Sequence, residues 1–154
     1  MKTELDQSRL DHLVGYAATR ASIHLKKSFA RHLGPLDLKA VEFSILVIVA
    51  SNEQVNQKQL GQALDVSAPN LAVILDRLQE RGLIKRVRSD LDRREQHVKL
   101  TEAGRALGER AEAIGATMES DALKVLSEAE RLLLLELLRK VAAGMPRVNA
   151  SPTP

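Results

Sequence analysis

The chain has no cysteine and no tryptophan, and its aromatic residues are limited to Tyr16, Phe29 and Phe43. Without cysteine it cannot form a disulfide framework, a thiolate zinc site or an iron–sulfur cluster, and it has no thiol that could act as a nucleophile or sense peroxide. Proteins that stack single-stranded or flipped bases need several aromatic faces, so this kind of nucleic-acid binding is not expected.

Long apolar runs are also missing. The longest, residues 43–50, contains a serine and is far too short to span a bilayer. The first six residues already include acidic side chains, and no apolar stretch of the signal-peptide kind follows. We therefore expect a soluble cytoplasmic protein with no membrane partner.

The composition is that of a globular protein. The 154 residues suit one domain of ordinary size, and 44% of them are hydrophobic and 28% charged. Lysine and arginine together number 23, and aspartate and glutamate 20. The resulting net charge of +3 is too small to indicate a partner by itself.

Apolar side chains recur with a helical period in the first third of the chain. They predict a long helix from Leu5 to Leu33, which stops at Gly34 because the following Pro35 cannot continue a helix. Asp37 is then expected to cap a second helix that ends near Ala50.

The next segment has the pattern of a helix-turn-helix. Residues 56–67 predict a short helix followed by a tight turn at Asp65. Ser67 is expected to cap a second helix that runs to Arg81 and ends at Gly82 in a left-handed conformation. Two short helices joined in this way form a common DNA-binding arrangement.

Beyond this unit the period changes to that of strands, and residues 84–88 and 96–100 predict a β-hairpin with a charged tip. Thr101 is expected to cap a helix, and a last helix is predicted from Glu128 to Ala143. The inward positions expected on the helix after Thr101 are Ala103, Leu107, Ala111, Ile114 and Met118.

The predicted fold class is mainly α with a small β-hairpin wing, a winged helix-turn-helix. The winged helix-turn-helix itself is expected over residues 37–100. Helices are expected over residues 5–33 and 102–143, and a disordered tail over residues 146–154.

Leucine surrounds the last predicted helix on several sides. A helix that is apolar on several sides is buried on several sides, and a small domain offers few such places. This predicts a subunit interface; the alternative is that the helix threads the core of its own chain. The residues concerned are Leu132, Leu133, Leu134, Leu135, Leu137, Leu138 and Val141.

Positive charge is concentrated in the hairpin. Residues 81–99 contain seven basic and three acidic side chains, a net of +4, whereas residues 102–143 contain six basic and eight acidic ones, a net of −2. A duplex-binding surface needs such a concentration, so helix 68–81 is expected in the major groove and hairpin arginines in an adjacent minor groove. The alternative, a merely solvated hairpin, leaves the helix-turn-helix before it unexplained.

Two segments lie in and just after the predicted helix-turn-helix: residues 60–67 (LGQALDVS) and 75–84 (LDRLQERGLI). In these segments the sequence resembles the MarR family of winged helix-turn-helix regulators. The D-x-R-x5-L-T wing signature of that family is matched by Asp92, Arg94, Leu100 and Thr101. The resemblance implies a homodimer in which the first and last two helices interlock, so that residues 5–33 and 102–143 form a helical dimerisation region. It also implies a protein that represses transcription until a small ligand loosens it.

The resemblance also implies roles for individual residues. Arg94 would enter the minor groove, and Asp92 would shape the wing by pairing with a neighbouring arginine. Arg77 would contact the DNA backbone, while Val73 stands where the family often has a polar or basic residue. A valine can pack on a thymine methyl group but cannot hydrogen-bond to a base. The expected DNA-binding residues are Gln57, Lys58, Ser67, Ala68, Asn70, Val73, Arg77, Arg86, Arg88, Asp92, Arg93 and Arg94.

A ligand site is expected along the first predicted helix, where Tyr16, Arg20, His24 and Ser28 recur at every fourth position as a slanted polar ridge. The resemblance implies a small aromatic or phenolic acid, or its thioester, in a crevice between the first, second and fifth helices. Arg20 would pair with the carboxylate, Tyr16 and His24 would supply hydrogen bonds, and Phe43 an apolar wall. The alternative is that these are surface or dimer-seam residues.

Enzymatic activity is not expected. The sequence has no Gly-x-Gly-x-x-Gly, P-loop, His-Glu-x-x-His or nucleophile-elbow motif, and it predicts no cofactor and no metal site. The alternative to a regulator is a non-catalytic winged-helix module for protein interactions. Salt-dependent duplex binding would separate the two.

Overall fold

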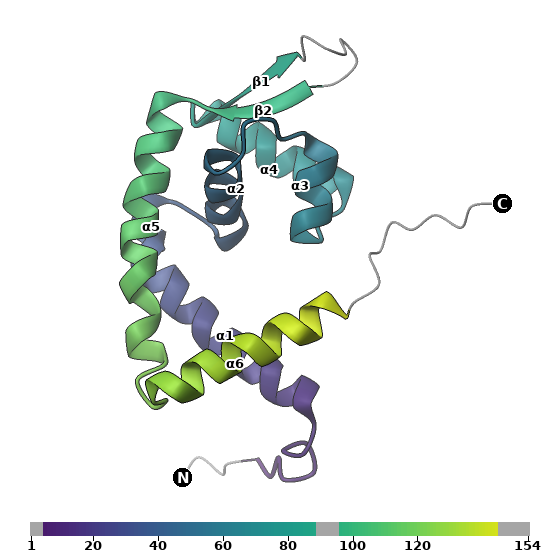
Figure 1. Cartoon of the computed structure of the whole chain (residues 1–154), viewed down its shortest axis with the longest axis vertical. Helices are drawn as coiled ribbons and strands as arrows, with labels where there is room; N and C mark the ends of the chain where they lie inside the picture. The colour runs from purple at the N-terminus through teal and green to yellow at the C-terminus, as the bar shows by residue number, and fades with distance from the viewer. Residues whose placement is uncertain (1–4, 89–95, 145–154) are drawn as a thin grey trace, which may run out of the picture.

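A computed structural model describes residues 5–88 and 96–144 of the chain, and its regular elements are helices and one β-hairpin (Figure 1). The predicted fold class and both strand ranges are confirmed. The predicted tail over residues 146–154 lies outside the described residues. The elements in chain order are α1 (Val14–Leu33), the 3-10 helix η1 (Gly34–Leu36), α2 (Ala40–Ala50), α3 (Gln57–Leu64), α4 (Ala68–Glu80), β1 (Ile84–Arg88), β2 (Gln96–Leu100), α5 (Glu102–Ala122) and α6 (Glu128–Ala143).

The hairpin lies at one end of α5, and α6 lies at the other end (Figure 1). Strands β1 and β2 pair antiparallel, with Ile84 opposite Leu100. The Val98 N–H donates to the Val55 carbonyl at 2.7 Å, which attaches the hairpin to the segment before α3. The hairpin is therefore held by α2–α3 as well as by its own ladder.

The core lies where α2, α3, α4 and the hairpin converge. Its centre is a group of leucines with no exposed surface, each supplied by the inward stripe of its helix. Full burial of such a side chain contributes roughly 1.5–3 kcal/mol. These leucines are Leu46, Leu60, Leu71, Leu75 and Leu78.

The predicted start of the first helix is wrong. α1 begins at Val14 rather than at Leu5. Residues 5–13 are exposed throughout, so their apolar side chains gain no burial that would stabilise a helix. The Ser8 N–H instead donates to the Asp6 carboxylate at 2.9 Å in a local turn.

Two further local predictions are wrong. Asp37 does not cap α2 but ends η1 in the left-handed region, at φ 50°. The α2 N-terminus is closed by Glu42, whose carboxylate accepts the Lys39 N–H at 2.8 Å. In α5 the residue that faces inward is Gly104, and the predicted Ala103 is exposed.

Helix α6 has no buried residue in the described chain. The exposed fractions of its large apolar side chains run from 38% at Leu134 to 68% at Val141. The alternative that this helix threads the core of its own chain is therefore wrong. Among the described residues, none of the helices has the length and apolarity needed to cross a bilayer.

Candidate nucleic-acid interface

The turn between α3 and α4 is fixed by short-range contacts. At the start of α3, Asn56 accepts the Gln59 N–H at 2.8 Å and donates its own N–H to the Gln59 side chain at 2.9 Å. At its end Asp65 takes the left-handed conformation, φ 50°. A side chain at Gly61 would lie 3.0 Å from the Val66 carbonyl oxygen, so a glycine here lets the turn close tightly.

Helix α4 presents two opposite faces. Its buried face carries the core leucines, and its other face is open to solvent, with Val73 69% exposed. Ser67 occupies the predicted N-cap position, but its hydroxyl makes no capping bond within the described residues. The residues expected to meet DNA on this exposed face are brought together at the start of the helix: Ser67, Ala68, Asn70 and Val73. At the start of α3, Lys58 is exposed and Gln57 half-buried.

The hairpin places like charges opposite one another. Lys85 and Lys99 are direct cross-strand partners, and both are exposed. Like charges in this arrangement destabilise a hairpin, and an adjacent polyanion would relieve the repulsion. Arg88 is exposed at the end of β1, where the chain enters the tip.

The other described hairpin arginine is turned inward. Arg86 donates to the Asp76 carboxylate at 2.6 Å and to the Gln79 side-chain oxygen at 3.0 Å, both on α4. It therefore braces the hairpin against the helix. The predicted wing-tip residues Asp92, Arg93 and Arg94 lie outside the described residues.

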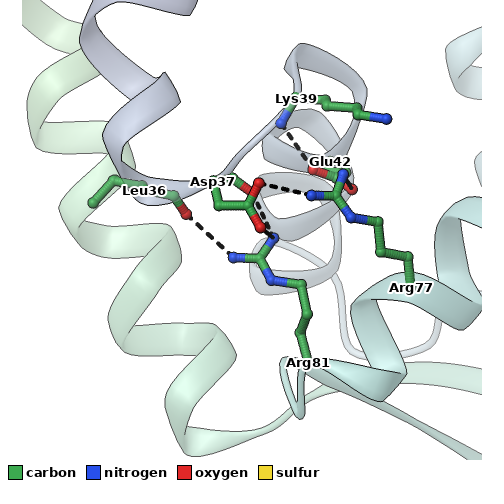
Figure 2. Close-up of polar contacts among 6 residues, drawn as sticks. All are labelled: Leu36, Asp37, Lys39, Glu42, Arg77 and Arg81. Carbon is green, nitrogen blue, oxygen red and sulfur yellow. Dashed lines mark hydrogen bonds and ion pairs between the residues drawn. The ribbon is translucent and has the colours of Figure 1, made fainter.

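Arg77 also faces other parts of the chain. Figure 2 shows its guanidinium between two carboxylates, with Nη1 donating to Glu42 at 2.7 Å and Nη2 to Asp37 at 2.8 Å. The hydrogen bond to Asp37, and then the charge of Glu42, raise the pKa of Arg77 above its ordinary value. We call the group drawn there the corner cluster: Leu36, Asp37, Lys39, Glu42, Arg77 and Arg81.

The predicted ligand residues do not share one location. Ser28 is buried and donates to the Met118 carbonyl on α5 at 2.9 Å. Phe43 packs edge-to-face on Phe29, with ring centroids 5.8 Å apart, and lies near Gly115 of α5. Ser28 and Phe43 thus converge on the second half of α5.

The other three ligand residues lie nearer the start of α1. Arg20 and His24 are exposed, and the half-buried Tyr16 hydroxyl donates to the Gln7 side chain. A cavity of about 530 Å³ in the described part of the chain is lined by other residues, namely 49–54, 98–100 and Arg105. Across residues 5–88 and 96–144, no group of three or more acidic or histidine side chains is placed to hold a metal ion.

These features define the winged-helix class of DNA-binding protein: a helix-turn-helix whose second helix has one face open to solvent, and a cationic hairpin packed against that helix. The MarR family model matches residues 36–95. The multiple antibiotic resistance protein MarR of Escherichia coli (strain K12) is 32% identical over 111 residues, which cover 71% of this chain and 77% of that protein. The chain belongs to the MarR family and is a DNA-binding transcriptional regulator rather than an enzyme.

Two solved structures of the transcriptional repressor CouR are similar to the whole fold. The repressor bound to a 23-mer DNA duplex has 35% identity and a TM-score of 0.85, covering 91% of this chain and 99% of that one. The repressor bound to p-coumaroyl-CoA has 32% identity and a TM-score of 0.84, covering 92% of this chain and 100% of that one.

Proposed function

We propose that this protein is a homodimeric repressor that binds pseudo-palindromic duplex DNA and is released by a small aromatic or phenolic carboxylate or its thioester. The observation that carries the proposal is the solvent-facing side of α4, which bears small and polar residues and stands beside a hairpin with exposed lysines. The similarity to a repressor bound to DNA supports the same use of that face.

The proposed dimer uses the exposed leucines of α6. A helix with this much uncovered apolar surface is costly in water and is stabilised by association. Leu10, Leu13 and Ile23, before and within α1, are also at least 40% exposed and add further uncovered apolar surface. A two-fold axis would present two copies of α4 about one helical turn of DNA apart, which matches a pseudo-palindromic site.

In the proposed complex, the start of α4 enters the major groove. Asn70 can hydrogen-bond to a base edge, and Val73 can pack on a thymine methyl group. Lys58 and Arg88 are exposed cations suited to phosphates. Arg94 would reach the minor groove, as the resemblance of the wing signature implies.

The proposed effector is an aromatic acid or its thioester. The neighbour bound to p-coumaroyl-CoA supports this class. Arg20 and His24 are exposed on α1 and could hold an anionic group. Phe43, which lies apart from them against Phe29 and near Gly115 of α5, would supply an aromatic wall for the rest of the ligand. A second copy of the chain would close this open surface into a crevice. The effector would release DNA by binding more tightly to a dimer whose two α4 helices no longer fit successive grooves.

The effector proposal is tested by release from a labelled duplex, followed by fluorescence anisotropy. The compounds are p-coumarate, p-coumaroyl-CoA and coenzyme A alone. We expect release by at least one of the first two, weakened in Arg20→Ala and His24→Ala but unchanged in Lys26→Ala, an exposed cation on the same helix. Release that stays intact in both site variants would overturn these ligand residues. If no compound releases the DNA, the ligand class is rejected and the DNA-binding function stands.

A further inference from the structure

We propose that Arg77 and Arg81 are positioning residues, which lock the recognition helix α4 to the corner between α1 and α2 and so set the angle at which α4 meets DNA. This inference rests on the proposed function. It assigns Arg77 a role other than the phosphate contact implied by the family resemblance.

The corner cluster uses both arms of each guanidinium. Arg77 divides its two terminal nitrogens between Glu42, in the first turn of α2, and Asp37, at the end of η1. Arg81, the residue that directly follows α4, donates to the Asp37 carbonyl at 2.6 Å and to the Leu36 carbonyl at 3.2 Å. Figure 2 shows the two arginines reaching side by side from α4 into the same corner.

The burial of Glu42 makes it energetically costly to break its ion pair with Arg77. Its side chain is 1% exposed, and a buried carboxylate is unfavourable unless it is paired and hydrogen-bonded. The Glu42 carboxylate accepts hydrogen bonds from the Lys39 N–H, at 2.8 Å, and from Arg77, at 2.7 Å. If Arg77 swung outward to a phosphate, Glu42 would keep one backbone donor and lose its counter-charge. The pairing therefore favours an Arg77 that stays in place when DNA binds.

Asp37 gives the corner its shape. It sits in the left-handed region at φ 50°, four residues after the last residue of α1, which is the buried Leu33. Its carboxylate and its carbonyl both accept from α4. A change in the tilt of α4 would have to break these bonds, because the planar guanidinium of Arg77 fits two fixed acceptors at once.

The phosphate-contact and positioning roles predict opposite results for Asp37→Asn. Removal of a negative charge near DNA strengthens binding if electrostatics alone matters. In the positioning role the same change weakens binding to the operator, because α4 loses a charge-assisted bond. Asp65→Asn is the matched control: Asp65 is also exposed, also in the left-handed conformation at φ 50°, and precedes α4. Asparagine tolerates that conformation at both positions.

The second variant is Arg77→Lys. Lysine keeps the charge for a phosphate but cannot divide two fixed donors between Glu42 and Asp37. The phosphate role predicts operator affinity close to that of the wild type. The positioning role predicts a clear loss of operator affinity, with no change in the affinity for unrelated duplex.

The experiment uses an operator selected by the wild-type protein from random-sequence duplexes, with a scrambled duplex as the non-specific probe. Affinities for both are measured over a series of KCl concentrations. For Asp37→Asn and Arg77→Lys we expect a loss of roughly five- to tenfold in operator affinity, with non-specific affinity and the salt slope unchanged. Asp65→Asn should bind at least as well as the wild type.

Two outcomes would overturn the inference. One is operator binding by Asp37→Asn and Arg77→Lys as tight as that of the wild type. The other concerns Arg77→Ala: equal losses of affinity for both duplexes, together with a slope of log affinity against log salt concentration that is smaller by about 0.9. That is the result expected for one lost phosphate contact. Thermal unfolding of each variant identifies a purely structural effect, which would lower the melting temperature without changing the ratio of specific to non-specific affinity. If the wild type selects no operator, the proposed function itself fails.

Discussion

Gly104 packs directly on the backbone of Leu83: a Cβ atom at Gly104 would lie 1.8 Å from the Leu83 carbonyl oxygen. Thr101 completes the same joint. Its N–H donates to that oxygen at 3.1 Å, its hydroxyl donates to the Gly82 carbonyl at 2.6 Å, and it accepts the Gly104 N–H at 3.0 Å. The end of α4, the return strand of the hairpin and the start of α5 therefore meet at one point.

The first prediction concerns this joint. Gly104→Ala forces backbone apart, so we expect it to lower the free energy of unfolding by about 1–3 kcal/mol or more. Gly108→Ala, one turn along α5, is the control, because its new Cβ would lie at an ordinary 3.7 Å from Leu46. That variant should be neutral or slightly stabilising. Urea unfolding at a fixed protein concentration checks both; equal stability of the two variants would contradict the close contact.

The second prediction concerns the leucines of α6. The double substitution Leu134→Glu with Leu138→Glu places two charges on exposed apolar surface. We expect it to convert the proposed dimer to a monomer of 16.9 kDa and to abolish operator binding. Light scattering after size exclusion gives the mass. Val125→Glu, at a position 83% exposed between α5 and α6, is the control for an added carboxylate. If the double variant stays dimeric, α6 is not part of the interface.

The third prediction concerns the start of α6. The Glu130 carboxylate accepts the Ser127 N–H at 2.8 Å and its hydroxyl at 2.9 Å, and these bonds lower the pKa of Glu130 below its ordinary value of 4.5. A carboxyl with a lowered folded-state pKa stabilises the fold above its unfolded pKa, and this contribution is lost as pH falls through the folded value.

The wild type should therefore be more stable than Glu130→Gln at pH 7, and the difference should shrink as pH falls below about 4.5. Urea midpoints at several pH values measure this difference. Glu128→Gln removes a charge from the same turn without touching the capping bonds, so it serves as the control. A difference between wild type and Glu130→Gln that does not vary with pH would rule out the capping carboxylate as its source.

The fourth prediction concerns the wing. Arg94 lies outside the described residues, and the wing signature assigns it to the minor groove. Arg94→Ala should weaken operator binding by on the order of 1–3 kcal/mol at fixed salt. Lys26→Ala, which removes a charge from α1, should not. Unchanged affinity in Arg94→Ala would refute the minor-groove role.

Local chemistry explains which parts of the fold could be predicted from the sequence. Gly82 takes the left-handed conformation expected of it, with φ 68°, and the Thr101 hydroxyl caps α5 as predicted. Between these two residues the alternating pattern predicts both strands with the correct bounds. The residues expected to meet DNA at the start of α4 are likewise found on its exposed face: Ser67, Ala68, Asn70 and Val73.

The errors arise where a distant residue decides the outcome. Asp37 has the chemistry of a helix cap, but its carboxylate is taken by Arg77, which is 40 positions later in the chain. Likewise, Ala103 and Gly104 differ by one step in helical phase, and only the approach of Leu83 decides which of them can face inward. Rules based on residue spacing use only the local sequence, so they cannot predict these tertiary contacts.

The central claim, that α4 and the hairpin bind duplex DNA, is tested most directly by titrating the purified protein onto labelled duplex from upstream of its own coding sequence, at several salt concentrations. We expect tight binding, with the logarithm of the binding constant falling linearly with the logarithm of salt concentration. The reason is that lysine and arginine side chains neutralise phosphates and so release counterions from the DNA. Absence of binding at low salt would contradict the account and favour a winged-helix module for protein interactions.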